Sequence, residues 1–148
     1  DINGNDLLLY DRSVHKDKIE DDDLLFQLFA TAPFLKSETI RRCVKMLEAN
    51  YNIYDSIFTA TDENGWFWFE RQPVNYLPNV LPRSQDARHV VKETTGLYGI
   101  TNHALNKYNC RIGANPKIEI IDKYEAIDLD DNLDFEYAEY ILQKGLIK

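Results

Sequence analysis

The segment that decides the fold runs from Leu24 to Thr61 and reads LLFQLFATAPFLKSETIRRCVKMLEANYNIYDSIFTAT. Residues 24–29 are almost all apolar, as in a strand that is buried on both faces of a parallel sheet. Ser37 is a suitable N-cap for a helix, and residues 56–61 read as a second strand. The apolar residues between them recur at helical spacing, at Ile40, Cys43, Val44 and Leu47. The order strand, helix, strand predicts an α/β fold with a mostly parallel, three-layer, Rossmann-like sheet.

The segment from residue 65 to residue 91 interrupts this pattern. Asn64-Gly65 is a strong hairpin turn signal, and four consecutive aromatic residues follow it at 66–69. A strand that is apolar on both faces cannot have both of them covered by its own domain, and large exposed apolar patches mark interaction surfaces. We therefore expect a protruding β-hairpin arm over 65–91 that serves as a dimerisation insert in a homodimer. The alternative is that the aromatic segment folds back on the core of its own subunit.

The rest of the chain reads as one domain over residues 1–148. Short apolar runs predict further strands at 7–10, 96–100, 118–121 and 124–129. A last helix is expected from about Asn132 to Gln143, with Asp131 or Asn132 as its N-cap.

Composition excludes several classes of protein. The hydrophobic fraction of 44% and the 148-residue length are those of a globular domain with a sizeable core. A net charge of −8 argues against a nucleic-acid partner, which needs clustered Lys and Arg. Cys43 and Cys110 have no zinc-ligand spacing. Nothing reads as a signal peptide or a membrane span, so we expect a cytoplasmic protein without membrane contact.

Two carboxylates, Asp128 and Asp130, stand two residues apart at the end of an apolar run. On a strand both would point the same way, toward a spot beyond its carboxyl end. Mg²⁺ suits such a spot, because it takes oxygen ligands and often only one or two protein carboxylates. The alternative is that this Asp-rich segment only caps the following helix, and the segment by itself favours that alternative.

Four motifs in a fixed order support the first interpretation. They are Thr31-Ala32-Pro33-Phe34-Leu35, Arg83-Ser84-Gln85-Asp86, Gly96-Leu97-Tyr98 and Ala126-Ile127-Asp128-Leu129-Asp130. Their order and spacing resemble the acylneuraminate cytidylyltransferases, or CMP-sialic acid synthetases, over nearly the whole chain from Leu24 onward. The resemblance implies a transferase that joins CMP from CTP to a nine-carbon acidic sugar and releases pyrophosphate. It also implies Mg²⁺ as cofactor and an arm that reaches the neighbouring subunit.

The resemblance implies a role for several residues. Asp128 and Asp130 would be catalytic and would hold Mg²⁺, while Arg83 would bind the sugar's carboxylate with two parallel hydrogen bonds. The alternative for Arg83 is a surface pair with Asp86. Gln85 could hydrogen-bond the sugar or complete a turn.

Three other residues could face a ligand. Tyr98 matches a sugar-facing tyrosine of the family, although an aromatic residue on a strand also fits a core position. Thr31 could reach a ligand at the carboxyl end of its strand. Arg111 falls where the family places residues against the sugar's side chain, and a surface role fits it equally well.

The sequence departs from the family in one major respect. None of its six glycines forms the phosphate-binding loop with which the family begins, so the amino-terminal phosphate-loop unit is absent and we expect no CTP turnover by these residues alone. Two alternatives follow. The chain could come from the related deoxy-octulosonate cytidylyltransferases, or it could be a non-catalytic, dimerising, sugar-binding fragment.

Overall fold

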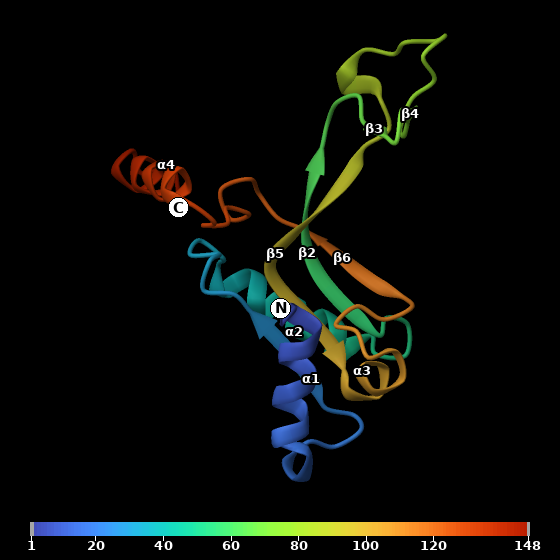
Figure 1. The fold of residues 1–148 in the computed structure, drawn as a ribbon, viewed down its shortest axis with the longest axis vertical. Coiled ribbons are helices and arrows are strands. Elements are labelled where there is room, and N and C mark those ends of the chain that lie inside the picture. The colour runs from blue at the N-terminus through green and yellow to red at the C-terminus, as the bar shows by residue number, and fades with distance from the viewer. Residues whose placement is uncertain (1, 148) are drawn as a thin grey trace.

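The computed structural model of the chain describes residues 2–147. A four-stranded sheet forms the centre, and a two-stranded ribbon stands apart from it (Figure 1). The sheet strands are β1 (Leu24–Leu28), β2 (Ser56–Glu63), β5 (Val90–Thr101) and β6 (Pro116–Ile120), and the ribbon holds β3 (Trp68–Phe69) and β4 (Gln72–Pro73). The helices are α1 (Gly4–Val14), α2 (Ser37–Ala49), α3 (Asn102–Tyr108) and α4 (Asn132–Gln143), with 3₁₀ turns η1 (Lys16–Lys18) and η2 (Ser84–Asp86).

The sheet is mixed, which corrects the expected mostly parallel arrangement. Its strand order is β1-β5-β2-β6. β1 and β2 run in the same direction, as their connection through α2 predicts, but β5 lies between them and is antiparallel to both. Among the described residues, β2 and β6 are the one pair of neighbouring strands that runs in parallel. Gly99 of β5 lies beside Phe26, and a Cβ at this position would come within 2.4 Å of the Phe26 ring.

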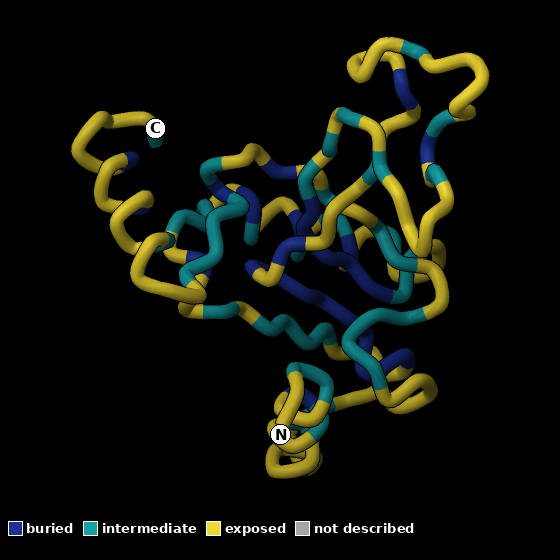
Figure 2. Tube along the Cα trace, turned by 45° about the horizontal axis from the view of Figure 1, so that its top comes forward, coloured by how far each residue is buried: buried dark blue, intermediate teal, exposed yellow. Residues whose placement is uncertain are grey.

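The core lies on both faces of the sheet. On one face, Cys43 and Leu47 of α2 pack against Ile57 and Leu97. On the other face, Leu8 of α1 packs against Ile100 together with two residues of α3. Figure 2 shows that buried residues follow the central strands, whereas the arm and α4 are mostly exposed. The α/β layering is therefore as expected, although the strand order is not.

Two expected strands are absent from the structure. Residues 7–10 lie in the middle of α1, which begins at a capping box formed by Asn3 and Asp6. Residues 124–129 form a turn and a loop, because one Asp122 carboxylate oxygen accepts the backbone N–H groups of both Tyr124 and Glu125. Asp128 and Asp130 therefore lie on a loop and not at the end of a strand.

The cap of α4 was predicted correctly, and that of α2 was not. Asp131 is the N-cap of α4 and forms a capping box with Asp134. α2 begins at Ser37 itself, one residue earlier than expected, and its N-cap Lys36 makes no side-chain capping bond.

The arm is an extension of β2 and β5 beyond the sheet, as Figure 1 shows. The last pair of the extension joins Glu63 to Val90, and the residues between them form the tip. The Asn75 side chain holds the tip together, because it donates to the carbonyl oxygens of Gly65 and Arg88 and accepts from the N–H of Phe67. A small protruding hairpin is thus present within the expected segment, but its turn lies at Glu70-Arg71, which both have positive φ, and not at the predicted Asn64-Gly65. Within the part of the chain that the structure describes, no helix is long and apolar enough to cross a bilayer.

Candidate functional site

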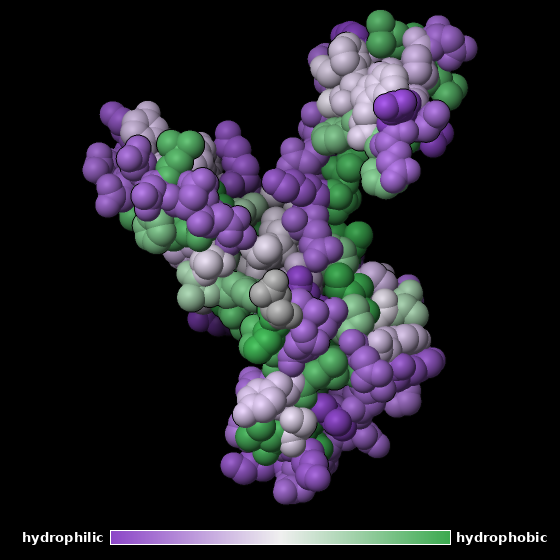
Figure 3. Space-filling model, viewed as in Figure 1, coloured by the Kyte–Doolittle hydropathy of each residue, from purple (hydrophilic) through white to green (hydrophobic). Residues whose placement is uncertain are grey.

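A cavity of about 340 Å³ lies between the base of the arm and the loop that leads to α4. Its charged lining residues are Glu63, Lys92, Glu93, Lys123, Asp128 and Asp130. Figure 3 shows α4 and the arm standing apart on this face, with a wide hollow between them. The cavity is next to the carboxyl-terminal half of β2, and α/β sheets usually bind ligands beyond the carboxyl ends of their strands.

A larger cavity of about 840 Å³ lies at the other end of the sheet. It is lined by residues that precede β1 and β2, including Asp21, Asp22 and Asp55. None of the site residues predicted from the sequence lies there, and the smaller cavity is therefore the candidate site.

Asp128 has one satisfied carboxylate oxygen and one unsatisfied oxygen. Its Oδ2 accepts a short hydrogen bond from the hydroxyl of Thr95 on β5. Its Oδ1 is buried and has no hydrogen-bond partner among the described residues. A buried carboxylate oxygen without a donor or a cation is destabilising. Oδ1 of Asp128 is therefore the candidate ligand-binding atom of the cavity.

The loop that carries Asp128 is fixed at two points. The backbone N–H of Leu129 donates to the carbonyl of Thr31 over 2.8 Å. Further upstream, the Lys36 ammonium lies 2.9 Å from Asp122, and the Lys36 backbone N–H donates to the buried Glu125 carboxylate. The hydrogen bond between Lys36 and Asp122 raises the pKa of Lys36 and lowers the pKa of Asp122. These contacts hold the loop against the turn that follows β1.

The two carboxylates fit a magnesium ion only in combination with other ligands. Asp130 lines the same cavity as Asp128, and its backbone N–H donates to Asp134 over 2.9 Å. Across residues 2–147, no group of three or more His, Cys, Asp or Glu side chains is placed to bind a metal. Mg²⁺ commonly takes one or two carboxylates and completes its shell with water and phosphate oxygens. The unsatisfied Oδ1 of Asp128 therefore fits such an ion.

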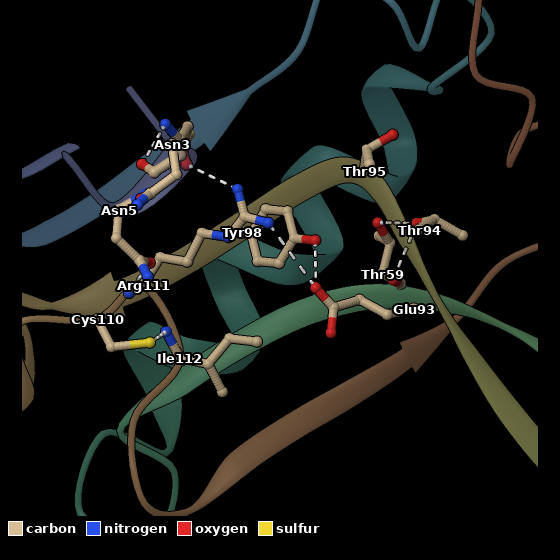
Figure 4. A network of polar contacts seen from close by, with 12 residues as sticks. Asn3, Asn5, Thr59, Glu93, Thr94, Thr95, Tyr98, Cys110, Arg111 and Ile112 are labelled. Carbon is tan, nitrogen blue, oxygen red and sulfur yellow. Dashed lines mark hydrogen bonds and ion pairs between the residues drawn. The ribbon is translucent and has the colours of Figure 1, made fainter. Parts of the chain in front are cut away.

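Tyr98 lies at the centre of a second group of residues beside the cavity (Figure 4). Its side chain is buried, and its hydroxyl donates a short hydrogen bond to the carboxylate of Glu93. Phe29 meets the ring edge-on with centroids 6.2 Å apart, and Phe58 stacks at 6.4 Å. Burial, and secondly the hydrogen bond to Glu93, raise the pKa of Tyr98, so the phenol stays protonated as a donor. Tyr98 is thus a core residue that is connected to the cavity through Glu93, which lines it.

Arg111 also belongs to this group, which excludes the surface role. Its side chain is 21% exposed, and its guanidinium carbon lies 3.6 Å from the centroid of the Tyr98 ring. Nη2 is 3.8 Å from the Glu93 carboxylate. Its backbone N–H donates to the side chain of Asn5 over 3.0 Å, which attaches this loop to the start of α1.

The structure separates the predicted site residues into two groups. Thr31, Tyr98, Asp128 and Asp130 lie on or next to the cavity. Arg83 and Gln85 lie on the arm, where the Arg83 guanidinium makes an exposed pair with Asp86 at 2.6 Å. The surface pair that was the alternative for Arg83 is the one observed within this chain.

Comparison with known proteins supports the fold alone. No protein-family model matches the sequence, and no curated protein does either. Among solved structures, the chain is similar to the crystal structure of 2-C-methyl-D-erythritol 4-phosphate cytidylyltransferase from Francisella tularensis, with a TM-score of 0.53 and 16% sequence identity. The match covers 84% of this chain and 61% of that enzyme. The chain therefore has an α/β fold that resembles part of a nucleotidyltransferase.

Proposed function

We propose that this chain belongs to a cytidylyltransferase of the acylneuraminate type, which transfers CMP from CTP to the anomeric hydroxyl of a nine-carbon acidic sugar. The observation that carries the proposal is the buried, unpaired oxygen of Asp128 beside Asp130, on a sheet that resembles a cytidylyltransferase. The resemblance of the four ordered motifs supplies the choice of acceptor. The chain spans 61% of the solved enzyme, and the activity proposed is that of the whole protein.

In this proposal, Asp128 and Asp130 hold Mg²⁺. The bound ion would neutralise phosphate charge and stabilise the departing pyrophosphate. Thr95 fixes the direction of the Asp128 carboxylate. Lys92 and Lys123 line the same cavity and offer positive charge to a triphosphate.

The proposed reaction forms one bond at phosphorus and breaks one. The acceptor's hydroxyl oxygen forms a bond to the α-phosphorus of CTP, the bond from that phosphorus to the bridging oxygen breaks, and the hydroxyl proton is released. Such a transfer needs positioning and charge stabilisation and no protein nucleophile. Polar and charged side chains around one cavity suit that task.

The arm suits a homodimer in this proposal. Large apolar side chains are exposed on it, namely Trp66, Trp68, Phe69, Val74, Leu77, Val80 and Leu81. An exposed apolar surface of this kind is typical of an interface. In such a dimer, Arg83 and Gln85 of one subunit would lie near the cavity of the other subunit. This would account for their distance from the cavity of their own subunit.

One observation favours a second candidate, the non-catalytic sugar-binding fragment. The sequence has no glycine-rich loop whose N–H groups could hold the CTP phosphates. If residues beyond these 148 do not supply such a loop, Tyr98 and Arg111 would bind a sugar without transfer.

A pyrophosphate-release assay on the whole protein, with CTP and Mg²⁺, tests the proposal. The acceptors are a panel of nonulosonic acids, deoxy-octulosonate and 2-C-methyl-D-erythritol 4-phosphate, the compound for which the similar enzyme is named. We expect release with a nonulosonic acid and not with the other two. Release with deoxy-octulosonate or with the erythritol phosphate instead would assign a different acceptor. If none of the tested acceptors gave pyrophosphate release, the non-catalytic fragment would be favoured.

A further inference from the structure

The position of the Arg111 guanidinium is determined by its neighbours on both sides. The Tyr98 ring lies 3.6 Å away on one side, in a cation–π contact. Near it, Gly4 begins α1, and a Cβ at Gly4 would lie only 2.1 Å from Nη1 of Arg111. The helix thus starts with the one residue that leaves room for this cation. Figure 4 shows the guanidinium between the start of α1 and the Tyr98–Glu93 pair.

The charge of Arg111 is incompletely neutralised in this position. A guanidinium has five N–H donors, and the structure records one side-chain hydrogen bond for it among the described residues, at 3.5 Å to Gln27. Glu93 is 3.8 Å from Nη2, beyond hydrogen-bond reach, and its near oxygen already accepts from Tyr98. A mostly buried cation whose polar partners lie at 3.5 and 3.8 Å can bind the anionic group of a ligand.

Arg83 differs from Arg111 both in the exposure of its side chain and in the hydrogen bonds of its guanidinium. Its guanidinium makes two hydrogen bonds to Asp86, at 2.6 and 3.3 Å, and its side chain is 73% exposed. A two-point pair of this kind already uses the planar fork that would recognise a carboxylate.

We infer that Arg111, and not Arg83, binds the carboxylate of the acceptor sugar, within the same subunit that holds the Asp128 site. This inference rests on the proposed function. In a nonulosonic acid the carboxylate is attached to the anomeric carbon, so its binding site must lie close to the site of transfer. Glu93 links the two places, because its carboxylate accepts the hydrogen bond of Tyr98 beside Arg111 and the residue also lines the cavity that holds Asp128.

The surrounding charges favour such a role for Arg111. Glu93, Asp128 and Asp130 line the cavity and would repel an acidic sugar, while the two lysines of the lining, Lys92 and Lys123, face the triphosphate in the proposed function. Arg111, which lies over the Tyr98 ring, would offset the repulsion at the acceptor, and its contact with that ring fixes the position of the guanidinium.

The experiment compares an acidic probe with a neutral one of the same shape. The probes are N-acetylneuraminic acid and its carboxamide, and their dissociation constants are measured by ligand-observed NMR on the protein that carries this chain. We expect the wild type to bind the acid about tenfold to a hundredfold more tightly than the carboxamide, as a charge-assisted hydrogen-bonded pair would. Arg111→Gln should bring this ratio close to one. The control Arg41→Gln, at an exposed position on α2, should leave it unchanged.

Several results would overturn the inference. They are a ratio near one in the wild type, an unchanged ratio in Arg111→Gln, or loss of the preference in Arg83→Gln with Arg111→Gln unaffected. Should Arg111→Gln fail to fold, Arg111→Lys, which keeps the charge and loses the fork, should lower the ratio severalfold, and an unchanged ratio would count against Arg111. CTP binding is measured separately by calorimetry. Absence of CTP binding would refute the proposed function, whereas the acid-to-carboxamide ratio tests Arg111 alone.

Discussion

The hydroxyl of Thr95 donates a hydrogen bond to one oxygen of Asp128 and leaves the other oxygen buried without a partner among the described residues. Thr95 is on β5 and Asp128 is on the loop that leads to α4, so the contact joins two segments 33 residues apart in the sequence. It fixes one carboxylate oxygen, and in the proposed function the second oxygen binds the metal. The proposed metal chemistry depends on this arrangement.

We predict that Thr95→Val lowers the apparent affinity for Mg²⁺ by about tenfold to a hundredfold, the usual effect of losing a residue that orients a metal ligand. Valine has nearly the shape of threonine and lacks the hydroxyl. The measurement is the Mg²⁺ dependence of pyrophosphate release, with Thr95→Ser as the control that keeps the donor. Equal Mg²⁺ dependence in the valine and serine variants would remove Thr95 from the site.

Gly4→Ala should weaken binding of the acidic probe without destabilising the protein. The new Cβ would displace the end of the flexible Arg111 side chain, while alanine favours a helix by up to about 1 kcal/mol relative to glycine. Thermal unfolding and NMR titration of the two probes measure both effects. A lower Tm together with unchanged acid binding would show that Gly4 serves packing and not the position of Arg111.

The pair of Lys36 and Asp122 predicts a pH dependence of stability. The pKa of Asp122 is lowered in the folded state, so its contribution is present above its ordinary value of 3.8 and is lost as the pH falls through the folded value. The pKa of Lys36 is raised above 10.5, so its contribution is lost only as the pH rises above that value. Asp122→Asn should therefore lower the free energy of unfolding from about pH 5 to pH 9, and the difference should shrink below about pH 4. Denaturant unfolding at several pH values measures it, with the exposed Asp22→Asn as control. A difference that does not vary with pH would mean that Asp122 acts through its loop hydrogen bonds alone.

The two cysteines should differ sharply in reactivity. Cys43 of α2 is fully buried against the sheet, and burial raises the pKa of its thiol to about 12, whereas Cys110 is partly exposed. Because the thiolate is the reactive form, a maleimide should label Cys110 in the native protein and Cys43 only after denaturation. Mass spectrometry of the labelled peptides decides this. Rapid native labelling of Cys43 would contradict the packing of α2 on the sheet.

Phe69→Ser should weaken self-association at least about tenfold without lowering the stability of the subunit. Phe69 is 70% exposed on the arm, and in the proposed homodimer a second copy of the chain would bury its ring. Sedimentation equilibrium over a concentration series gives the dissociation constant, and Tyr51→Ser, an exposed aromatic residue on the body, is the control. A wild-type monomer at micromolar concentration would refute the arm as a dimer contact.

The sequence predicted those parts of the fold that depend on residues close to one another along the chain. The α4 helix was predicted from Asp131 and its apolar spacing, and its capping box with Asp134 is local. Residues 7–10 were misread because a short apolar run fits a helix or a strand equally well. The capping box of Asn3 and Asp6 was in the sequence and would have decided between them.

Features that depend on distant residues cannot be predicted from such local signals. The insertion of β5 between β1 and β2 is a matter of strand order, on which hydrophobic periodicity gives no information. The strand predicted for Asp128 does not form, because Asp122 closes a turn upstream. Arg111 gave no local signal of a site, since it reaches Tyr98 only through the loop between α3 and β6.

The most direct test of the central claim is Mn²⁺ binding in the presence of CTP, followed by electron paramagnetic resonance. Mn²⁺ replaces Mg²⁺ at oxygen sites and reports its own free concentration. The three proteins compared are the wild type, Asp128→Asn, and Glu136→Gln as an exposed acidic control on α4. If Asp128 holds the metal, Asp128→Asn should bind Mn²⁺ at least about tenfold more weakly than the other two. Equal binding by all three would contradict the assignment of Asp128 as a metal ligand and with it the proposed mechanism.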